Sequence, residues 1–168
     1  MRVSLPRFSA SVRDWFAASF DEPTPAQSRG WKAIADGDHT LILAPTGSGK
    51  TLAAFLWAID RLASEPPPDP KERTRVLYVS PLRALAVDVE KNLRAPLAGI
   101  QHAAERTGEP LAHVPQVGVR TGDTPARDRR RLVTHPPDIL ITTPESLYLM
   151  ITHRTLRRVS RACDVSIR

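Results

Sequence analysis

The residues best suited to chemistry lie in one short stretch, which reads "LILAPTGSGKTLAAFL" over positions 41–56. Gly47 and Gly49 permit backbone conformations that other residues avoid, and they let an anion approach the chain closely. Successive backbone N–H groups from Gly47 to Thr51 can then form a cradle for phosphate. Lys50 is placed to reach the β- and γ-phosphates of a nucleotide, and the Thr51 hydroxyl is placed to bind Mg²⁺. The stretch therefore predicts a nucleotide-phosphate site.

The flanking pattern predicts the elements that must hold this loop. The apolar run at 40–44 is typical of a buried strand, and large apolar residues recur on one helical face from Leu52 to Leu62. A strand before the glycine turn and a helix after it form the context in which such a turn binds phosphate. The expected site is thus a loop between a strand and a crossover helix.

The composition bounds the remaining functions. The chain has 168 residues, 41% of them hydrophobic, which suits about one domain with a real core. Its formal net charge is +6, carried mostly by arginine, and this favours polyanionic partners. The single cysteine, Cys163, excludes a disulfide framework, and the scattered histidines show no metal-ligand spacing. No apolar run is long enough to cross a bilayer and no signal segment opens the chain, so we expect a cytoplasmic protein without membrane contact.

Three further apolar runs predict a parallel sheet. They cover 75–79, 116–120 and 138–142, and each lacks the alternation of a half-exposed strand. Helical patterns separate them, so the order of elements predicts an α/β fold, a parallel sheet with crossover helices. Residues 1–38 predict two helices ahead of the sheet, the second ending near Gly37.

Serine or threonine followed by proline recurs directly after the predicted strands. The hydroxyl suits a helix cap and proline suits the first helical position, so we expect helices to begin at Pro81, Pro125 and Pro144, with a further copy at Pro25. In a parallel sheet these starts share the edge beyond the carboxyl ends of the strands, and the phosphate loop should open there too. Such a row could follow a sugar-phosphate backbone without reading bases, although plain helix capping explains any single pair.

Together these motifs resemble the first motor domain of superfamily 2 DEAD/DEAH-box helicases, and more narrowly the large helicase-related (Lhr) family of DNA-repair helicases. "PTPAQSRGW" is similar to the adenine-sensing Q motif, and "APTGSGKT" to motif I, including the alanine that is usual at its first position. "SPLRALA", "RTGDT" and "TTPESL" resemble motif Ia, the nucleic-acid contact that follows it, and motif Ib. The resemblance covers roughly residues 8–159 and implies a RecA-like P-loop NTPase domain.

The resemblance also implies ligands and roles. ATP and Mg²⁺ would be the cofactors, with Lys50 and Thr51 at the reacting phosphates and Thr51 as the metal ligand. The nucleotide-binding set would be Gln27, against adenine, with Thr46, Gly47, Ser48, Gly49, Lys50 and Thr51. An aromatic residue that stacks on adenine would be one of Phe8, Trp15, Phe16 and Phe20. The nucleic-acid-binding set would be Ser80, Arg83, Thr121, Gly122, Thr143 and Glu145, with single-stranded DNA or a DNA–RNA hybrid as partner.

The chain departs from the family after Val159. Motif II, a strand ending in Asp-Glu, should follow, but the sequence reads "LRRVSRACDVSIR" and Asp164 has no glutamate after it. Loss of these acids should severely impair phosphoryl transfer. We therefore expect a helical segment at 1–38, a partial first motor lobe at 39–159 and a divergent tail at 160–168. The whole would be a truncated piece of a longer helicase, incomplete at its C-terminus, lacking the motif II strand and unable to unwind alone.

Two other functions fit parts of the sequence. A nucleic-acid-binding module without ATP-driven activity would use the helix starts and the basic run at 126–133, although most such runs are solvated helix faces. Affinity that depends on ATP would separate this module from a helicase lobe. A different P-loop enzyme, such as a small kinase, would share motif I, but no acceptor-site pattern is evident.

Overall fold

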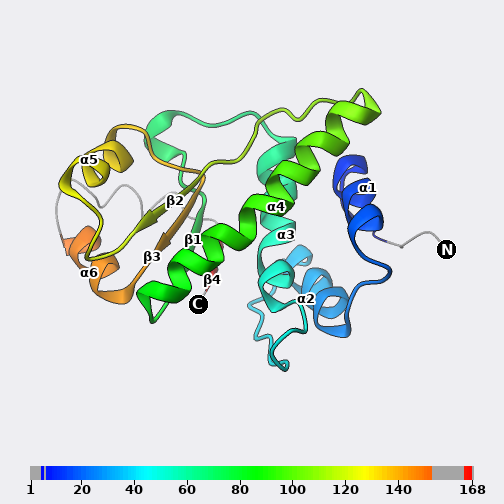
Figure 1. The fold of residues 1–168 in the computed structure, drawn as a ribbon, viewed down its shortest axis with the longest axis horizontal. Coiled ribbons are helices and arrows are strands. Elements are labelled where there is room, and N and C mark those ends of the chain that lie inside the picture. Colours follow the sequence, from blue (N-terminus) through cyan, green and yellow to red (C-terminus); the bar gives the residue numbers. More distant parts are fainter. Residues whose placement is uncertain (1–4, 6, 153–164, 168) are drawn as a thin grey trace. The chain divides into compact units, whose positions relative to one another are not determined.

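The structure is a computed structural model that describes residues 5, 7–152 and 165–167, and these residues form two compact units (Figure 1). The first, the helical unit, comprises residues 1–65 and 96–112, and the second, the sheet unit, comprises residues 66–95 and 113–168. The helical unit contains α1 (Ala10–Ser19), α2 (Pro25–Ala35), α3 (Lys50–Ser64) and the second part of α4 (Arg83–Thr107). The sheet unit contains the first part of α4, η1 (Pro70–Glu72), α5 (Ala126–Thr134), α6 (Pro144–Thr152) and four strands.

Aromatic residues build the core of the helical unit. The Phe8 ring meets the rings of Trp31 and Trp57 edge-on, at centroid distances of 5.1 and 5.5 Å, and Phe16 meets Trp31 at 5.6 Å. Phe55, with Leu56 and Ile59 of α3, is completely buried. The amphipathic pattern from Leu52 to Leu62 thus forms a helix whose apolar face lies in this core, as predicted.

A buried carboxylate joins α1 to α3. Asp60, on α3, accepts hydrogen bonds from the Ser9 backbone N–H at 3.3 and 3.2 Å, while the Ser9 hydroxyl caps α1 by accepting from the Val12 N–H. Burial raises the pKa of the Asp60 carboxyl above its ordinary value, and the hydrogen bonds from Ser9 oppose that shift only in part.

The predicted helix start at Pro25 is confirmed. Thr24 is the N-cap of α2, its hydroxyl accepts from the Gln27 N–H, and the Gln27 side chain accepts from the Thr24 N–H in return. This reciprocal pair is a capping box, and Pro25 occupies the first helical position, where its missing N–H costs nothing. The helix ends at Ala35, and Gly37 follows with φ of 83°, so the predicted stop is also correct.

The predicted strand at 40–44 is wrong. These residues pair with no other described strand, and Leu41 and Leu43 are 82% and 85% exposed. An apolar run favours burial, but a strand also needs a neighbouring strand to pair with, and residues 40–44 have none among the described strands. Ile42, between the two leucines, packs against Gly30 of α2 within the helical unit.

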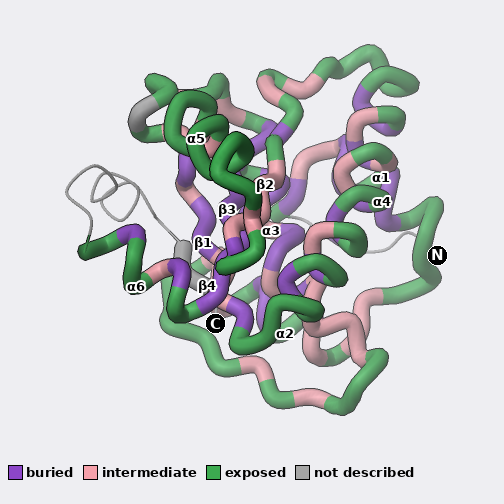
Figure 2. Tube along the Cα trace, turned by 60° about the vertical axis from the view of Figure 1, so that its left-hand side comes forward, coloured by how far each residue is buried: buried purple, intermediate pink, exposed green. Residues whose placement is uncertain are grey.

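The three other predicted strands form as expected. They are joined by a fourth in a sheet of order β2-β3-β1-β4, with every pair parallel (Figure 1). The strands are β1 (Val76–Val79), β2 (Val117–Arg120), β3 (Ile139–Thr142) and β4 (Val165–Ile167). β3 is buried along its whole length (Figure 2). β4 corrects the expectation that the tail supplies no strand beside β1, whereas Asp164 and the rest of 153–164 lie outside the described residues.

Asp138 sets the register at the amino ends of the strands. Its buried carboxylate accepts hydrogen bonds from the Gln116 N–H at 2.7 Å and from His113 Nε2 at 2.8 Å. Its carbonyl oxygen accepts from the N–H groups of Arg75 and Val76. One residue thus joins the entries to β1, β2 and β3, so the three strands reach their opposite ends in step.

Helix starts after these strands agree with prediction in one case of three. α6 begins at Pro144 as expected, but α4 begins at Arg83 rather than Pro81, and α5 at Ala126 rather than Pro125. The Ser80 hydroxyl donates to the Leu82 carbonyl instead of capping α4. The Thr124 hydroxyl likewise accepts from the Thr121 N–H and closes a turn ahead of α5. Local turns formed by the hydroxyls therefore displace the expected caps.

No helix in the described part of the chain is long and apolar enough to span a bilayer. The described residues also contain no group of three or more histidine, cysteine, aspartate or glutamate side chains that could hold a metal ion.

Candidate functional site

The phosphate loop has the backbone that its glycines predict. Gly47 and Gly49 have φ of 83° and 76°, in the left-handed region that favours glycine, and nothing lies within 4 Å of a Cβ built at Gly47. α3 begins at Lys50 with Gly49 as its N-cap, so no side chain caps the first turn. The N–H groups and the positive end of this helix are therefore available to an anion.

Polar side chains in the loop also fit a triphosphate. Lys50 Nζ donates to the carbonyls of Ala44 and Pro45, at 2.6 and 2.7 Å, which holds the ammonium group over the loop. The Ser48 hydroxyl oxygen is buried and has no hydrogen-bond partner among the described residues. Thr51 is half-buried in the first turn of α3. The loop thus combines uncapped backbone donors, the Lys50 ammonium group and the hydroxyl groups of Ser48 and Thr51.

The Q motif contacts this loop directly. The Thr24 hydroxyl donates to the Ser48 carbonyl at 2.8 Å, and Gln27 Nε2 donates to the Gly49 carbonyl at 3.5 Å. Gln27 is only 4% exposed, and its amide oxygen accepts from the Thr24 N–H at 3.0 Å. Two motifs separated by about twenty residues are therefore joined within one unit. The contact of Gln27 with adenine stays a prediction, since its amide is engaged with Thr24 and Gly49 in this structure.

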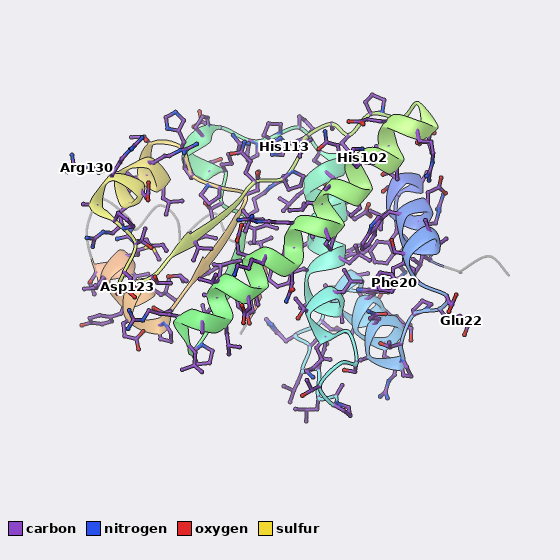
Figure 3. The ribbon with its side chains drawn as sticks, in the orientation of Figure 1. Phe20, Glu22, His102, His113, Asp123 and Arg130 are labelled. Atoms are coloured by element: carbon purple, nitrogen blue, oxygen red, sulfur yellow. The ribbon has the colours of Figure 1, made fainter. Side chains whose placement is uncertain are left out.

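The structure separates the four aromatic candidates for adenine stacking. Phe8, Trp15 and Phe16 are buried in the core of the helical unit. Phe20, at the end of α1, is 44% exposed, and its ring lies 4.9 Å from that of Phe16 and 5.9 Å from that of Trp15 (Figure 3). Phe20 is therefore the candidate with a ring surface open to a ligand and an aromatic support behind it.

In the sheet unit, the register brings three candidate nucleic-acid residues to one edge. Val79 and Arg120 both stand beside Thr142, so Ser80, Thr121 and Thr143 follow adjacent strands at the same level. The Ser80 N–H donates to the Thr142 carbonyl at 2.8 Å, and the Thr142 hydroxyl donates to the Arg120 carbonyl at 2.7 Å. The phosphate loop belongs to the helical unit, and its expected opening at this edge stays a prediction.

Burial divides the six nucleic-acid candidates. Ser80, Thr121 and Thr143 are buried, and the Thr143 hydroxyl, just before α6, donates to Ser146 Oγ in that helix at 3.3 Å. By contrast, the exposed candidates are Arg83, Gly122 and Glu145. The buried hydroxyls hold the turns, while the exposed groups are the ones that a polymer could reach.

Sequence reasoning missed one functional residue in the turns that follow β1, β2 and β3. Asp123 lies in the "RTGDT" turn, and its carboxylate forms an ion pair with the Arg83 guanidinium at the start of α4. Both side chains are largely exposed, and Figure 3 shows Asp123 at its turn. The sequence did offer a signal for Asp123. An acidic residue in a motif that is expected to contact phosphate would repel the ligand unless a nearby cation neutralises it.

Known proteins resemble this chain over most of its length. A family model described as DEAD/DEAH box helicase matches residues 24–163. The chain belongs to this family. It has the RecA-like α/β fold of helicase motor domains, with the phosphate loop before α3 and a parallel sheet with crossover helices.

Among curated proteins, the chain is similar to Lhr helicases. It is 63% identical over 148 residues to the Lhr helicase/probable uracil glycosylase of Mycolicibacterium smegmatis, covering 88% of this chain and 10% of that protein. It is 52% identical over 160 residues to the Lhr helicase/uracil glycosylase of Escherichia coli, covering 90% of this chain and 10% of the relative. The chain thus spans about a tenth of the length of these relatives.

Solved structures give the same result. The Mycobacterium smegmatis helicase Lhr bound to ssDNA and AMP-PNP superposes with a TM-score of 0.86 at 58% identity, covering 95% of this chain and 20% of that one. The DUF1998 helicase MrfA superposes with a TM-score of 0.75 at 20% identity, covering 97% of this chain and 23% of that one, and supports the fold alone.

Proposed function

We propose that this chain is the first motor lobe of an ATP-dependent DNA helicase and that it binds ATP and nucleic acid. The observation that carries the proposal is the pair of hydrogen bonds from Thr24 and Gln27 to the carbonyls of Ser48 and Gly49. They join an adenine-sensing motif to a phosphate loop, and a loop that served only as a structural turn would have no need of that connection.

The loop residues have separate tasks in this proposal. The N–H groups from Gly47 to Thr51 bind the phosphate oxygens, and Lys50 exchanges its contacts with the Ala44 and Pro45 carbonyls for the β- and γ-phosphates. The Thr51 hydroxyl holds Mg²⁺, which neutralises charge on those phosphates when it is bound. Ser48, Gly49 and Thr46 complete the cradle, while Phe20 and Gln27 lie on the adenine side.

The nucleic-acid contacts follow from exposure. Arg83 and the Gly122 backbone reach phosphate, Glu145 is exposed at the start of α6, and Ser80, Thr121 and Thr143 keep the turns in place. Single-stranded DNA or a DNA–RNA hybrid is the proposed track. The similar Mycobacterium smegmatis structure contains ssDNA and an ATP analogue, which supports this choice.

Equilibrium binding of a fluorescent ATP analogue with Mg²⁺ tests the nucleotide part. We expect Lys50→Ala to abolish binding, whereas Lys91→Ala, which removes an exposed lysine from α4, should leave it unchanged. Equal binding by all three proteins would overturn the proposal. The expectation that the chain binds ATP without hydrolysing it stays a prediction, which phosphate release with and without single-stranded DNA checks.

The alternative is a nucleic-acid-binding module in which ATP has no role. The phosphate loop belongs to the helical unit, whereas the helix starts that follow β1, β2 and β3 (the helix-start row) belong to the sheet unit. This division is the observation that favours the alternative. Affinity for single-stranded DNA, measured with and without the ATP analogue, decides between the two. If the ATP analogue changes the affinity for single-stranded DNA, and the change disappears in Lys50→Ala, the result supports the motor lobe. If the affinity is the same with and without the analogue, the result supports the module.

A further inference from the structure

A separate basic surface lies on α5 of the sheet unit. This helix, Ala126–Thr134, has no buried residue, and every position except Leu132 is exposed (Figure 2). Its arginines are Arg127, Arg129, Arg130 and Arg131, against the single acid Asp128. Within the described ranges, none of these four arginines forms an ion pair with a carboxylate. The surface therefore carries a positive charge that no ion pair with a described carboxylate neutralises.

The helix is held on the sheet so that this charge faces outward. A Cβ built at Gly118 of β2 would lie 2.8 Å from Leu132 Cδ2, so the bare glycine lets Leu132 rest on the strand. Arg130 is two positions before Leu132, which places it about 200° away around a helix of 3.6 residues per turn. Figure 3 shows Arg130 extending away from the sheet. Arg127, three positions earlier, shares its face.

Positive charge continues from α5 to the end of β2. Arg120, the last residue of that strand, is half-buried, and burial lowers the pKa of its guanidinium. Repulsion from the Arg129 guanidinium lowers the pKa of Arg120 further. Repulsion between neighbouring arginines destabilises the unbound protein, and a bound polyanion would reduce that repulsion.

We propose that the arginine face of α5 binds the phosphate backbone of duplex nucleic acid, beyond the single strand that the helix-start row would hold. The guanidinium group forks onto phosphate oxygens, which suits a backbone contact. No aromatic residue occurs between Thr121 and Thr134, so the face has no stacking platform for unpaired bases. This inference rests on the proposed function, because it adds a second contact to the same nucleic acid.

The test compares two fluorescent probes on the 168-residue chain: a short single strand, and the same strand extended by a hairpin duplex. Each bound phosphate contributes about 0.9 to the slope of log affinity against log salt. We expect Arg127→Ala with Arg130→Ala to lower that slope by about two for the extended probe alone. Between 50 and 200 mM salt, the unmodified chain should then lose about tenfold more affinity than the double variant.

Control variants keep the result interpretable. Arg106→Ala removes an exposed arginine from the end of α4 in the helical unit and should change neither slope. Arg127→Lys with Arg130→Lys retains the charge and should retain most of the slope. This variant remains informative even if the alanine variant fails to fold. Arg83→Ala should weaken the binding of both probes.

The outcomes separate the two proposals. A chain that binds neither probe contradicts the proposed function. A chain that binds the single strand, but whose slope with the extended probe does not respond to the α5 variants, contradicts the inference alone. Equal losses on both probes would place α5 on the single strand and also contradict it. Binding of polyglutamate as tightly as the duplex would identify an acidic protein as the partner instead.

Discussion

Gln27 and Gly49 lie so close together that a single methyl group on the glycine would overlap with the glutamine amide. The amide nitrogen donates to the Gly49 carbonyl, and Gly49 has φ of 76°. The glycine is thus required twice, once for its backbone conformation and once for the space that Gln27 fills.

Gly49→Ala should therefore destabilise the chain more than Gly47→Ala. Both sites have positive φ, which costs alanine about 1–2 kcal/mol, but only Gly49 also meets Gln27. Urea unfolding without nucleotide measures the difference, and Gln27→Ala should recover part of it in the Gly49→Ala background. Equal destabilisation at the two glycines would show that the contact has no energetic consequence.

Phe20→Ala should weaken ATP binding by about tenfold and leave the affinity for inorganic triphosphate unchanged. The exposed ring, supported by Phe16, is the expected adenine stacking surface, and loss of a base–aromatic stack costs about 1–3 kcal/mol. Competition of each ligand against a fluorescent ATP analogue measures both affinities. Phe20→Trp, which retains a stacking ring, should keep ATP affinity, and parallel losses for both ligands would argue against stacking.

Asp123→Asn should raise the affinity for single-stranded DNA about two- to fivefold at low salt. The carboxylate pairs with Arg83 and competes with phosphate for it, and an exposed pair of this kind is worth about 0.2–1 kcal/mol. Fluorescence anisotropy measures the affinity. Asp88→Asn on α4 removes the same charge from an exposed site and controls for net charge. The gain should vanish in the Arg83→Ala background, and a gain that persists there would exclude this explanation.

Asp60→Asn should remove one component of the pH dependence of stability. Burial raises the pKa of this carboxyl in the folded chain, so the folded state binds the proton more tightly than the unfolded state. Its contribution therefore favours folding at low pH and declines as the pH rises from the ordinary aspartate value of about 3.9 through the raised one.

Urea unfolding across pH 3–7 compares the two proteins. The unfolding free energy of Asp60→Asn, relative to the unmodified chain, should increase with pH over that window. Asp36→Asn should show the opposite trend, because hydrogen bonds from Arg7 and Lys32 lower the pKa of Asp36. A constant difference between Asp60→Asn and the unmodified chain would mean that burial does not perturb this acid.

Gly99→Ala should destabilise the helical unit although alanine favours helices. A Cβ at Gly99 of α4 would overlap with the Trp15 indole, and overpacking costs about 1–3 kcal/mol against a propensity gain of about 1 kcal/mol. Urea unfolding measures the net loss, which Trp15→Leu should abolish by making room. A variant more stable than the unmodified chain would show that Trp15 moves aside freely.

Local chemistry made several features predictable. Thr24 and Pro25 specify a helix start by hydrogen bonds and a fixed φ within four residues, and Gly47 and Gly49 specify a loop that other residues would strain. Apolar runs predicted β1, β2 and β3, and β3 is buried along its whole length, as a strand covered on both faces should be. The helix starts after β1 and β2 were misplaced, since turn hydroxyls found alternative partners nearby.

The sequence by itself determined the family, the phosphate loop and the parallel sheet, because these depend on residue types at short spacing. Only the tertiary structure decided that Gln27 bonds Gly49, that Phe20 is exposed while Phe16 is buried, and that Asp123 pairs with Arg83. It also left 40–44 unpaired, although its composition favours a strand. The burial of a side chain and the pairing of a strand depend on residues that are distant in the sequence. No local sequence pattern specifies which distant residues those are.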